Sequence, residues 1–144
     1  MKNYTDIEQS KKLAEILPIE SADMEYLAIK ENGKLIGNIP FVKDDSEVED
    51  SAYSQIYDRF ACWSLTSLLD ILPKEYTNSK NQVCTLHIDI VDSETPYLMW
   101  YANPEHEGSI VEMKTKEYSN LIDACYEMIV WLLENGCIKK GDSV

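Results

Sequence analysis

The sequence is poor in positive charge and in several residue types that serve enzyme chemistry. Only two histidines and five glycines occur among 144 residues. No glycine pattern matches GxGxxG or GxxxxGK, so a phosphate-binding loop is not predicted. No CxxC pair occurs, and we expect four reduced thiols that are mostly buried as small apolar groups. They are Cys62, Cys84, Cys125 and Cys137.

The shortage of basic residues excludes whole classes of partner. Thirteen Lys and Arg residues stand against 26 Asp and Glu residues, which leaves a formal net charge of −13. A field of this sign opposes binding to nucleic acid and to anionic membrane surfaces. The longest apolar run covers residues 128–133, whereas a membrane span needs about 20 residues. Because no apolar run follows Met1, we expect no signal peptide and a cytoplasmic location.

The chain length and the distribution of charge predict one domain over residues 1–144. Residues 43–50 are strongly acidic and form a predicted loop between residues 1–42 and a more compact part, residues 51–144. The loop lacks the central glycine and ligand order of an EF-hand. We interpret it as a solvated loop, with a docking site for a basic surface as the alternative.

The N-terminal part contains signals for a helix and a β-hairpin. Thr5 followed by Glu8 fits a capping box, and Pro18 ends the predicted helix. Asn32-Gly33 lies between two apolar stretches and predicts a hairpin over residues 26–37, because both residues tolerate positive φ. The hairpin either extends the main sheet or stands apart from it.

The C-terminal part alternates between helical and strand patterns. Ser64 is the predicted N-cap of a helix that Pro73 ends, and its apolar face comprises Leu65, Leu68, Leu69 and Leu72. Strict alternation predicts a half-buried strand over residues 83–91, and two further strands are predicted over residues 97–101 and 110–113. The predicted class is α+β, with an antiparallel sheet of three to five strands and an α-β-β-β-α core preceded by a helix and a hairpin.

The last predicted helix is apolar over most of its circumference. We expect Ser119 to cap it and Gly136 to end it. Val130 and Trp131 lie at the two edges of a narrow polar stripe. Such a helix is covered on more than one side, either by the N-terminal part of the chain or by another subunit. Trp131 and Val130 are therefore candidate interface residues, with burial under the N-terminal segment as the alternative for Trp131.

Residues 7–13, 22–24, 62–73 and 124–136 together carry a resemblance to a family. They resemble a group of small prophage and mobile-element proteins of gut bacteria, and the sheet with its two helices is similar to the phage ABA-sandwich domain. The resemblance supports the fold and the cytoplasmic location. It implies no catalytic residue, and residues 32–58 depart from it.

The strongest candidate for chemistry lies on the predicted strand 83–91. His87 and Asp89 are two residues apart and so share one face, and Thr85 extends this polar row. A carboxylate beside an imidazole orients a general base. The alternative interpretation is a solvated sheet face or a ligand-facing groove.

Other combinations of reactive residues are weaker. Cys84 and His87 point to opposite faces of a strand, and structural zinc needs four ligands. The side chains of residues 105–108 diverge along a loop. No family signature surrounds any cysteine. We therefore predict no metal and no cofactor.

Three functional hypotheses remain, in this order. The first is a non-enzymatic accessory or protein-binding protein of a phage or mobile element, with a protein partner or a homodimer. The second is an acidic inhibitor of a basic host protein. The third is an enzyme that uses Thr85, His87 and Asp89, which requires a concave pocket over that face.

Overall fold

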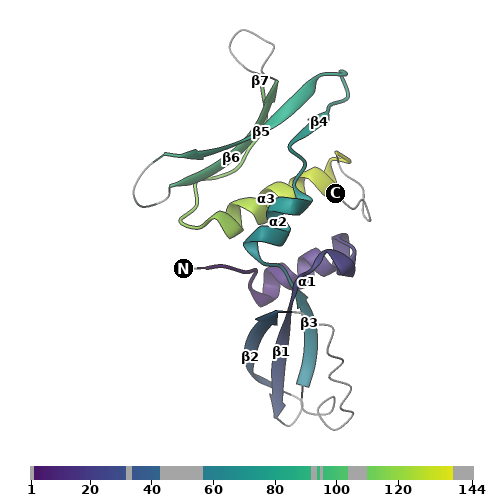
Figure 1. Cartoon of the computed structure of the whole chain (residues 1–144), viewed down its shortest axis with the longest axis vertical. Coiled ribbons are helices and arrows are strands. Elements are labelled where there is room, and N and C mark those ends of the chain that lie inside the picture. Colours follow the sequence, from purple (N-terminus) through teal and green to yellow (C-terminus); the bar gives the residue numbers. More distant parts are fainter. Residues whose placement is uncertain are drawn as a thin grey trace.

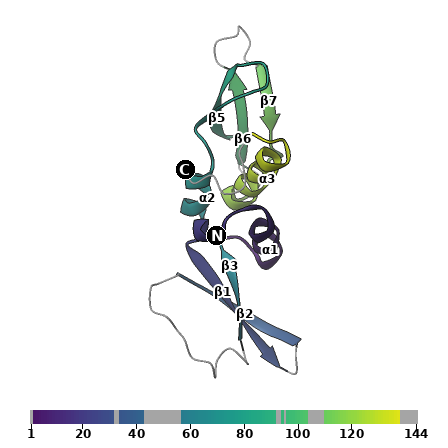
Figure 2. The same cartoon turned by 90° about the vertical axis from the view of Figure 1, so that its right-hand side faces the viewer.

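The computed structural model describes residues 2–31, 34–42, 57–91, 94, 96–103 and 110–137. Two antiparallel sheets lie at opposite ends of an elongated molecule, and the helices lie between them (Figures 1 and 2). The predicted α+β class is confirmed. The acidic segment 44–50, the turn Asn32-Gly33 and the loop 105–108 lie outside the described residues.

Each half of the molecule has its own sheet. The described helices are α1 (Ile7–Ile16), a short 3-10 turn (Ile19–Ser21), α2 (Leu65–Ile71) and α3 (Leu121–Glu134). The first sheet has the order β2-β1-β3, with β1 (Met24–Glu31), β2 (Lys34–Val42) and β3 (Tyr57–Cys62). The second has the order β4-β5-β6-β7, with β4 (Glu75–Thr77), β5 (Val83–Ile90), β6 (Tyr97–Asn103) and β7 (Ile110–Lys114).

The predicted hairpin is present and stands apart from the C-terminal sheet. β1 and β2 pair antiparallel from Met24 opposite Val42 to Glu31 opposite Lys34. β3, which the sequence did not predict, pairs with the other edge of β1. The three predicted C-terminal strands correspond to β5, β6 and β7, and the short β4 adds a further strand beside the first part of β5.

Two predicted helix caps are wrong by one residue, and one is confirmed. The N-cap of α1 is Asp6, which forms a capping box with Gln9, because the Thr5 side chain is buried and bonded elsewhere. The N-cap of α3 is Asn120 rather than Ser119. Ser64 caps α2 as predicted. Gly136 follows α3 with φ of +68°, a conformation that glycine adopts without strain.

α3 is covered on both sides by the chain itself. One side packs against β6, and the other packs against α1 and α2. Ile122, Cys125, Met128, Ile129 and Leu132 are fully buried along it. The N-terminal part therefore provides the cover that the apolar circumference of this helix requires, and no second subunit is needed for it.

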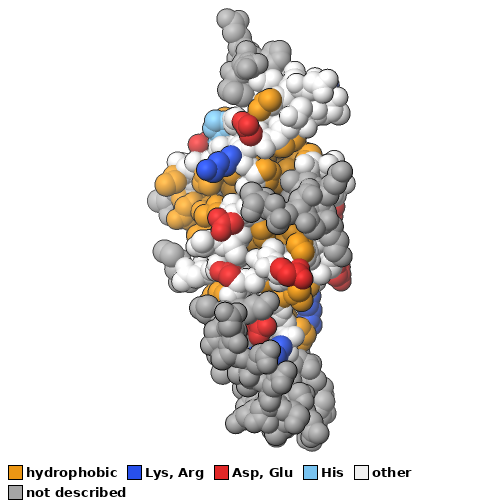
Figure 3. Space-filling model, turned by 45° about the vertical axis from the view of Figure 1, so that its right-hand side comes forward, with side chains coloured by type: hydrophobic (Ala, Val, Ile, Leu, Met, Phe, Trp, Pro, Cys, Tyr) orange, Lys and Arg blue, Asp and Glu red, His pale blue; other side chains and the backbone are white. Residues whose placement is uncertain are grey.

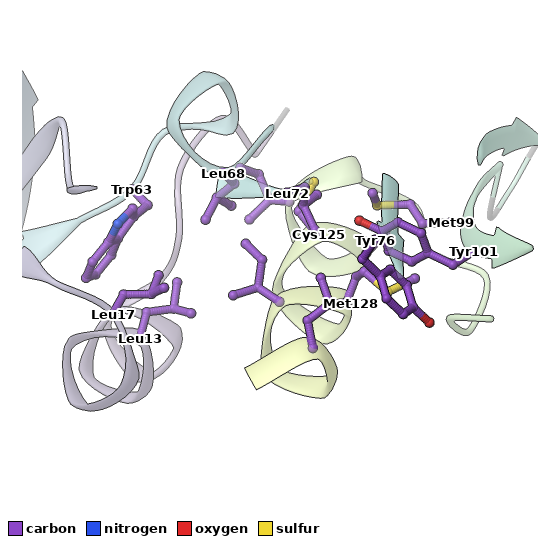
Figure 4. Packing of buried hydrophobic residues seen from close by; sticks show 14 of the residues in the cluster. Leu13, Leu17, Trp63, Leu68, Leu72, Tyr76, Met99, Tyr101, Cys125 and Met128 are labelled. Carbon is purple, nitrogen blue, oxygen red and sulfur yellow. The ribbon is translucent and has the colours of Figure 1, made fainter. Parts of the chain in front are cut away.

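The buried side chains form one continuous cluster from the N-terminal helix to the C-terminal sheet. Trp63 lies beside Leu13 and Leu17 at one end, and Met99 and Tyr101 lie beyond Met128 at the other (Figure 4). α3 and α2 lie between these ends. The cluster thus joins the helical layer to the sheet that carries the candidate site.

Thr5 is the polar centre of the N-terminal half. Its side chain is fully buried, and its Oγ1 accepts the backbone N–H of Trp63 at 3.1 Å and lies 2.8 Å from the Ser10 hydroxyl. Its carbonyl accepts the Tyr26 hydroxyl at 2.6 Å. These bonds join the N-terminal segment, α1, β1 and the end of β3, so Thr5 positions all four.

Two carboxylates join segments that are distant in sequence. Asp123, in the first turn of α3, accepts Lys2 Nζ at 2.7 Å and Gln9 Nε2 at 2.8 Å. Asp23 accepts the backbone N–H of Ser64 at 2.9 Å and also its hydroxyl, and so holds the residue that caps α2. Each of the two carboxylates therefore orients a helix end against the N-terminal half.

Replacement of Thr5 by valine tests the buried polar centre. Thr5→Val keeps the volume but leaves the Trp63 N–H and the Ser10 hydroxyl without this partner in a buried position. We expect a loss of about 1–3 kcal/mol in the free energy of unfolding, measured by urea denaturation. The exposed Thr66→Val on α2 is the matched control. Equal effects of the two substitutions would contradict the assignment.

The two carboxylates also predict acid sensitivity. Burial by itself would raise the pKa of Asp123, but hydrogen bonds from Lys2, Asn120 and Gln9 outweigh it and lower the pKa. Burial by itself would also raise the pKa of Asp23, but hydrogen bonds from Ser64 and Ser67 outweigh it and lower the pKa. A carboxylate whose pKa is lower in the folded than in the unfolded state stabilises the fold at pH above the unfolded pKa, about 3.9. This stability is lost as the pH falls through the folded pKa.

We therefore expect the thermal midpoint to fall as the pH is lowered below about 4. In Asp123→Asn the fall is smaller, because this variant has no carboxylate to protonate at that position. The exposed Asp70→Asn on α2 serves as the control and retains the full decline. Identical pH profiles for wild type and Asp123→Asn, recorded by circular dichroism, would refute the role of Asp123.

Candidate functional site

The predicted polar row lies on the face of the C-terminal sheet that points away from the helices. Thr85, His87 and Asp89 pair across β5 and β6 with Ala102, Trp100 and Leu98. Residues opposite each other in an antiparallel pair share a face. The other face carries Cys84, Met99 and Tyr101, which are buried against the helices. We call the face of Thr85, His87 and Asp89 the open face; Asp89 is exposed on it, whereas Leu98 and Ala102 of β6 on the same face are buried.

His87 is held on this face by two neighbours. Its Nε2 lies 3.1 Å from Thr85 Oγ1, so the two side chains share a hydrogen bond. Its ring stacks on Trp100, with centroids 4.1 Å apart and planes at 17°. Stacking of this kind fixes the imidazole against the sheet and covers one of its faces.

Asp89 bonds to the tryptophan rather than to the histidine. Its Oδ2 accepts the Trp100 Nε1–H at 2.8 Å. Within the described part of the chain, no hydrogen bond or ion pair joins Asp89 to His87. The carboxylate therefore orients the indole, and the carboxylate–imidazole pair on which the enzymatic hypothesis depends is not formed. The row is a packed polar and aromatic surface.

The far end of β5 exposes large apolar side chains. Ile88, Ile90 and Val91 are 43%, 77% and 45% exposed, and we call these three residues the β5 tip. Cys84, at the start of the same strand, is fully buried. α3 lies under β6, and the short β4 ends before this part of β5. The expected half-buried strand is thus exposed at Val83, buried at Cys84, half-buried in its middle and exposed from Ile88 onward.

Apolar surface also appears elsewhere on the molecule. Figure 3 shows hydrophobic side chains at the surface of the helical middle, with single acidic side chains among them. Ile19 and Leu69 are exposed to 55% and 36%. They are separate residues on different elements, and scattered exposed apolar residues are ordinary in soluble domains. The β5 tip differs because its three residues are adjacent on one strand end.

The cysteines are packing residues. All four are free thiols, and Cys62, Cys84 and Cys125 are buried, as predicted. Burial raises the pKa of the Cys125 thiol to about 12 and also raises that of Cys62. A raised thiol pKa lowers the thiolate population on which nucleophilic attack depends. Among the described residues, no group of three or more His, Cys, Asp and Glu side chains is arranged to hold a metal ion.

The two candidate interface residues on α3 are half-buried. Trp131 packs against the edge of the buried cluster, which agrees with cover from within the chain. Val130 lies beside it in sequence on the same helix. An interface role for Trp131 and Val130 stays a prediction, since both keep part of their side-chain surface open to solvent.

Trp100 is the residue that sequence reasoning missed. Its ring lies half-buried on the open sheet face. The alternation of β6 places Met99 and Tyr101 inward and Trp100 outward, so the face was predictable. The register that sets Trp100 opposite His87 was not predictable from the alternation, because the connection between β5 and β6 determines that register.

No described helix is long and apolar enough to cross a lipid bilayer. Comparison of the chain with protein-family models, with curated proteins and with solved structures finds no match.

Proposed function

We propose that this chain is a non-enzymatic protein-binding protein, and that it binds its partner through the β5 tip and the adjoining open sheet face. One observation carries the proposal: the three neighbouring apolar residues Ile88, Ile90 and Val91 are exposed together where β5 ends. Adjacent exposed apolar side chains favour protein contacts, because their burial on binding releases ordered water.

The neighbouring side chains support the same conclusion. Trp100 and His87 present a stacked aromatic pair on the open face, opposite to the face of Ile88 and Ile90, and Thr85 and Asp89 hold the pair in place. Rigid aromatic groups lose little entropy on binding and are enriched at interfaces. We place this binding activity in an accessory protein of a phage or mobile element, the setting that the sequence resemblance suggests.

An acidic inhibitor of a basic host protein is the second candidate, and the net charge of −13 favours it. Electrostatic complementarity accelerates association and weakens with added salt. In that case the retained partners are basic proteins that elute at high salt. In the first case apolar contacts dominate, and retention persists at high salt.

The experiment compares two substitutions on the same strand. Immobilised wild-type protein and the variants Ile90→Thr and Val83→Thr are exposed to a bacterial lysate, and the retained proteins are quantified by mass spectrometry. Val83 is 44% exposed at the opposite end of β5, so it is a matched control. Threonine preserves strand propensity in both variants.

We expect Ile90→Thr to lose most of the proteins that wild type and Val83→Thr retain. About a tenfold loss or more is expected, since burial of one isoleucine contributes about 1.5–3 kcal/mol and about 1.4 kcal/mol corresponds to tenfold. Unfolding midpoints of the three proteins are measured beside the capture. The same retained proteins in equal amounts on all three, with all three folded, would rule out binding through the β5 tip.

A further inference from the structure

The outer edge of β5 is open where the tip begins. β4 pairs only with Val83, Cys84 and Thr85. The next outward donor, the N–H of Leu86, is taken by the carbonyl of Lys74 at 2.8 Å. Beyond that point, no described residue forms a hydrogen bond with the edge of the strand.

The orientation of the free backbone groups follows from the strand geometry. Successive residues of a strand direct their N–H and C=O groups to opposite edges. The backbone N–H of Leu86 points outward, so those of Ile88 and Ile90 point outward too. The N–H of Val91 points inward and donates to the carbonyl of Pro96 at 2.8 Å. Ile88 and Ile90 together present two donors and two acceptors in the spacing of a strand ladder.

These groups select an extended segment as the occupant. A strand added to this edge pairs with all four backbone groups and adds its own apolar side chains beside Ile88 and Ile90. Asp89 lies between them, is exposed, and points to the opposite face. A basic side chain opposite Asp89 forms a favourable cross-strand pair.

Charge also disfavours a second copy of this chain as the strand that pairs with this edge. The antiparallel register that uses both free residues of each copy places Ile88 opposite Ile90 and therefore Asp89 opposite Asp89. Like charges directly opposite each other destabilise a strand pair. Each copy also carries a net charge of −13, which adds long-range repulsion.

We infer that the β5 edge at Ile88 and Ile90 binds an extended segment of a partner protein, in which a lysine or arginine lies between two apolar residues and opposite Asp89. The inference rests on the proposed function and deepens it. It adds the mode of binding, which is addition of a strand to the sheet, and the chemistry of the segment.

The probe is the synthetic peptide acetyl-Thr-Thr-Val-Lys-Val-Thr-Thr-amide. Binding to the full chain is followed by NMR titration and by hydrogen exchange of the Ile88 and Ile90 amides. We expect these two amides, which have no hydrogen-bond partner among the described residues, to exchange at least about fivefold more slowly at saturation. A peptide with glutamate in place of lysine binds about two- to fivefold more weakly.

Two variants separate the backbone contribution from the side chains. Ile90→Pro removes one outward N–H and no bond to β6, since proline is tolerated at such an edge position. We expect about fivefold weaker peptide binding than for Ile90→Thr, which keeps the N–H. Asp89→Asn removes the preference for lysine over glutamate but keeps an acceptor for Trp100, and Asp70→Asn leaves the preference unchanged.

Several results would overturn the inference. One is equal peptide binding by Ile90→Pro and Ile90→Thr with both folded; another is peptide protection of amides elsewhere but not at Ile88 and Ile90. A dimer in sedimentation equilibrium that Ile90→Pro abolishes would assign the edge to a second copy.

If lysate capture depends on Ile90 while the peptide fails to bind, the proposed function stands and strand addition fails. If the peptide binds while lysate capture does not depend on Ile90, strand addition stands and the proposed function fails.

Discussion

Burial of α3 is the constraint on which the other elements depend. This helix has apolar residues around most of its circumference, so it needs cover on two sides. The C-terminal sheet supplies one side through β6, and α1 with α2 supplies the other. Burial of each large apolar side chain contributes about 1.5–3 kcal/mol, which is large against the marginal stability of a domain. The two sheets are therefore held at opposite ends of the helical layer, as Figure 1 shows.

Polar contacts set the orientation that apolar burial leaves open. Hydrophobic packing is non-directional, whereas hydrogen bonds fix which groups meet. Thr5 joins Trp63, Ser10 and Tyr26 within a buried centre, and Asp123 joins α3 to Lys2 and Gln9. The N-terminal segment is thereby held against α1, β1 and α3. The helical layer gains a defined arrangement, and so does the sheet that it supports.

The binding surface is a consequence of the same arrangement. Because β4 is short and α3 lies under β6, the end of β5 pairs with β6 on one side, and no described strand pairs with its other edge. Ile88 and Ile90 are exposed there, and the packed pair His87 and Trp100 lies on the opposite face of the sheet. Natural sheets usually protect an open edge with charge. Here one acidic residue, Asp89, lies between the two isoleucines and selects among partners by their charge.

Local patterns determined much of this structure. Alternation defined β5 and its two faces, the leucine spacing defined α2, and Asn32-Gly33 between apolar stretches predicted the pairing of β1 with β2. Short-range geometry suffices for these features, because each depends on a few neighbouring residues. The N-cap of α1 was displaced by one residue because a buried contact took the expected cap, Thr5. Tertiary structure alone decided that β3 joins the hairpin, that Trp100 lies opposite His87, and that Asp89 bonds to the indole. These depend on which strands pair and in which register, and no local pattern encodes that choice.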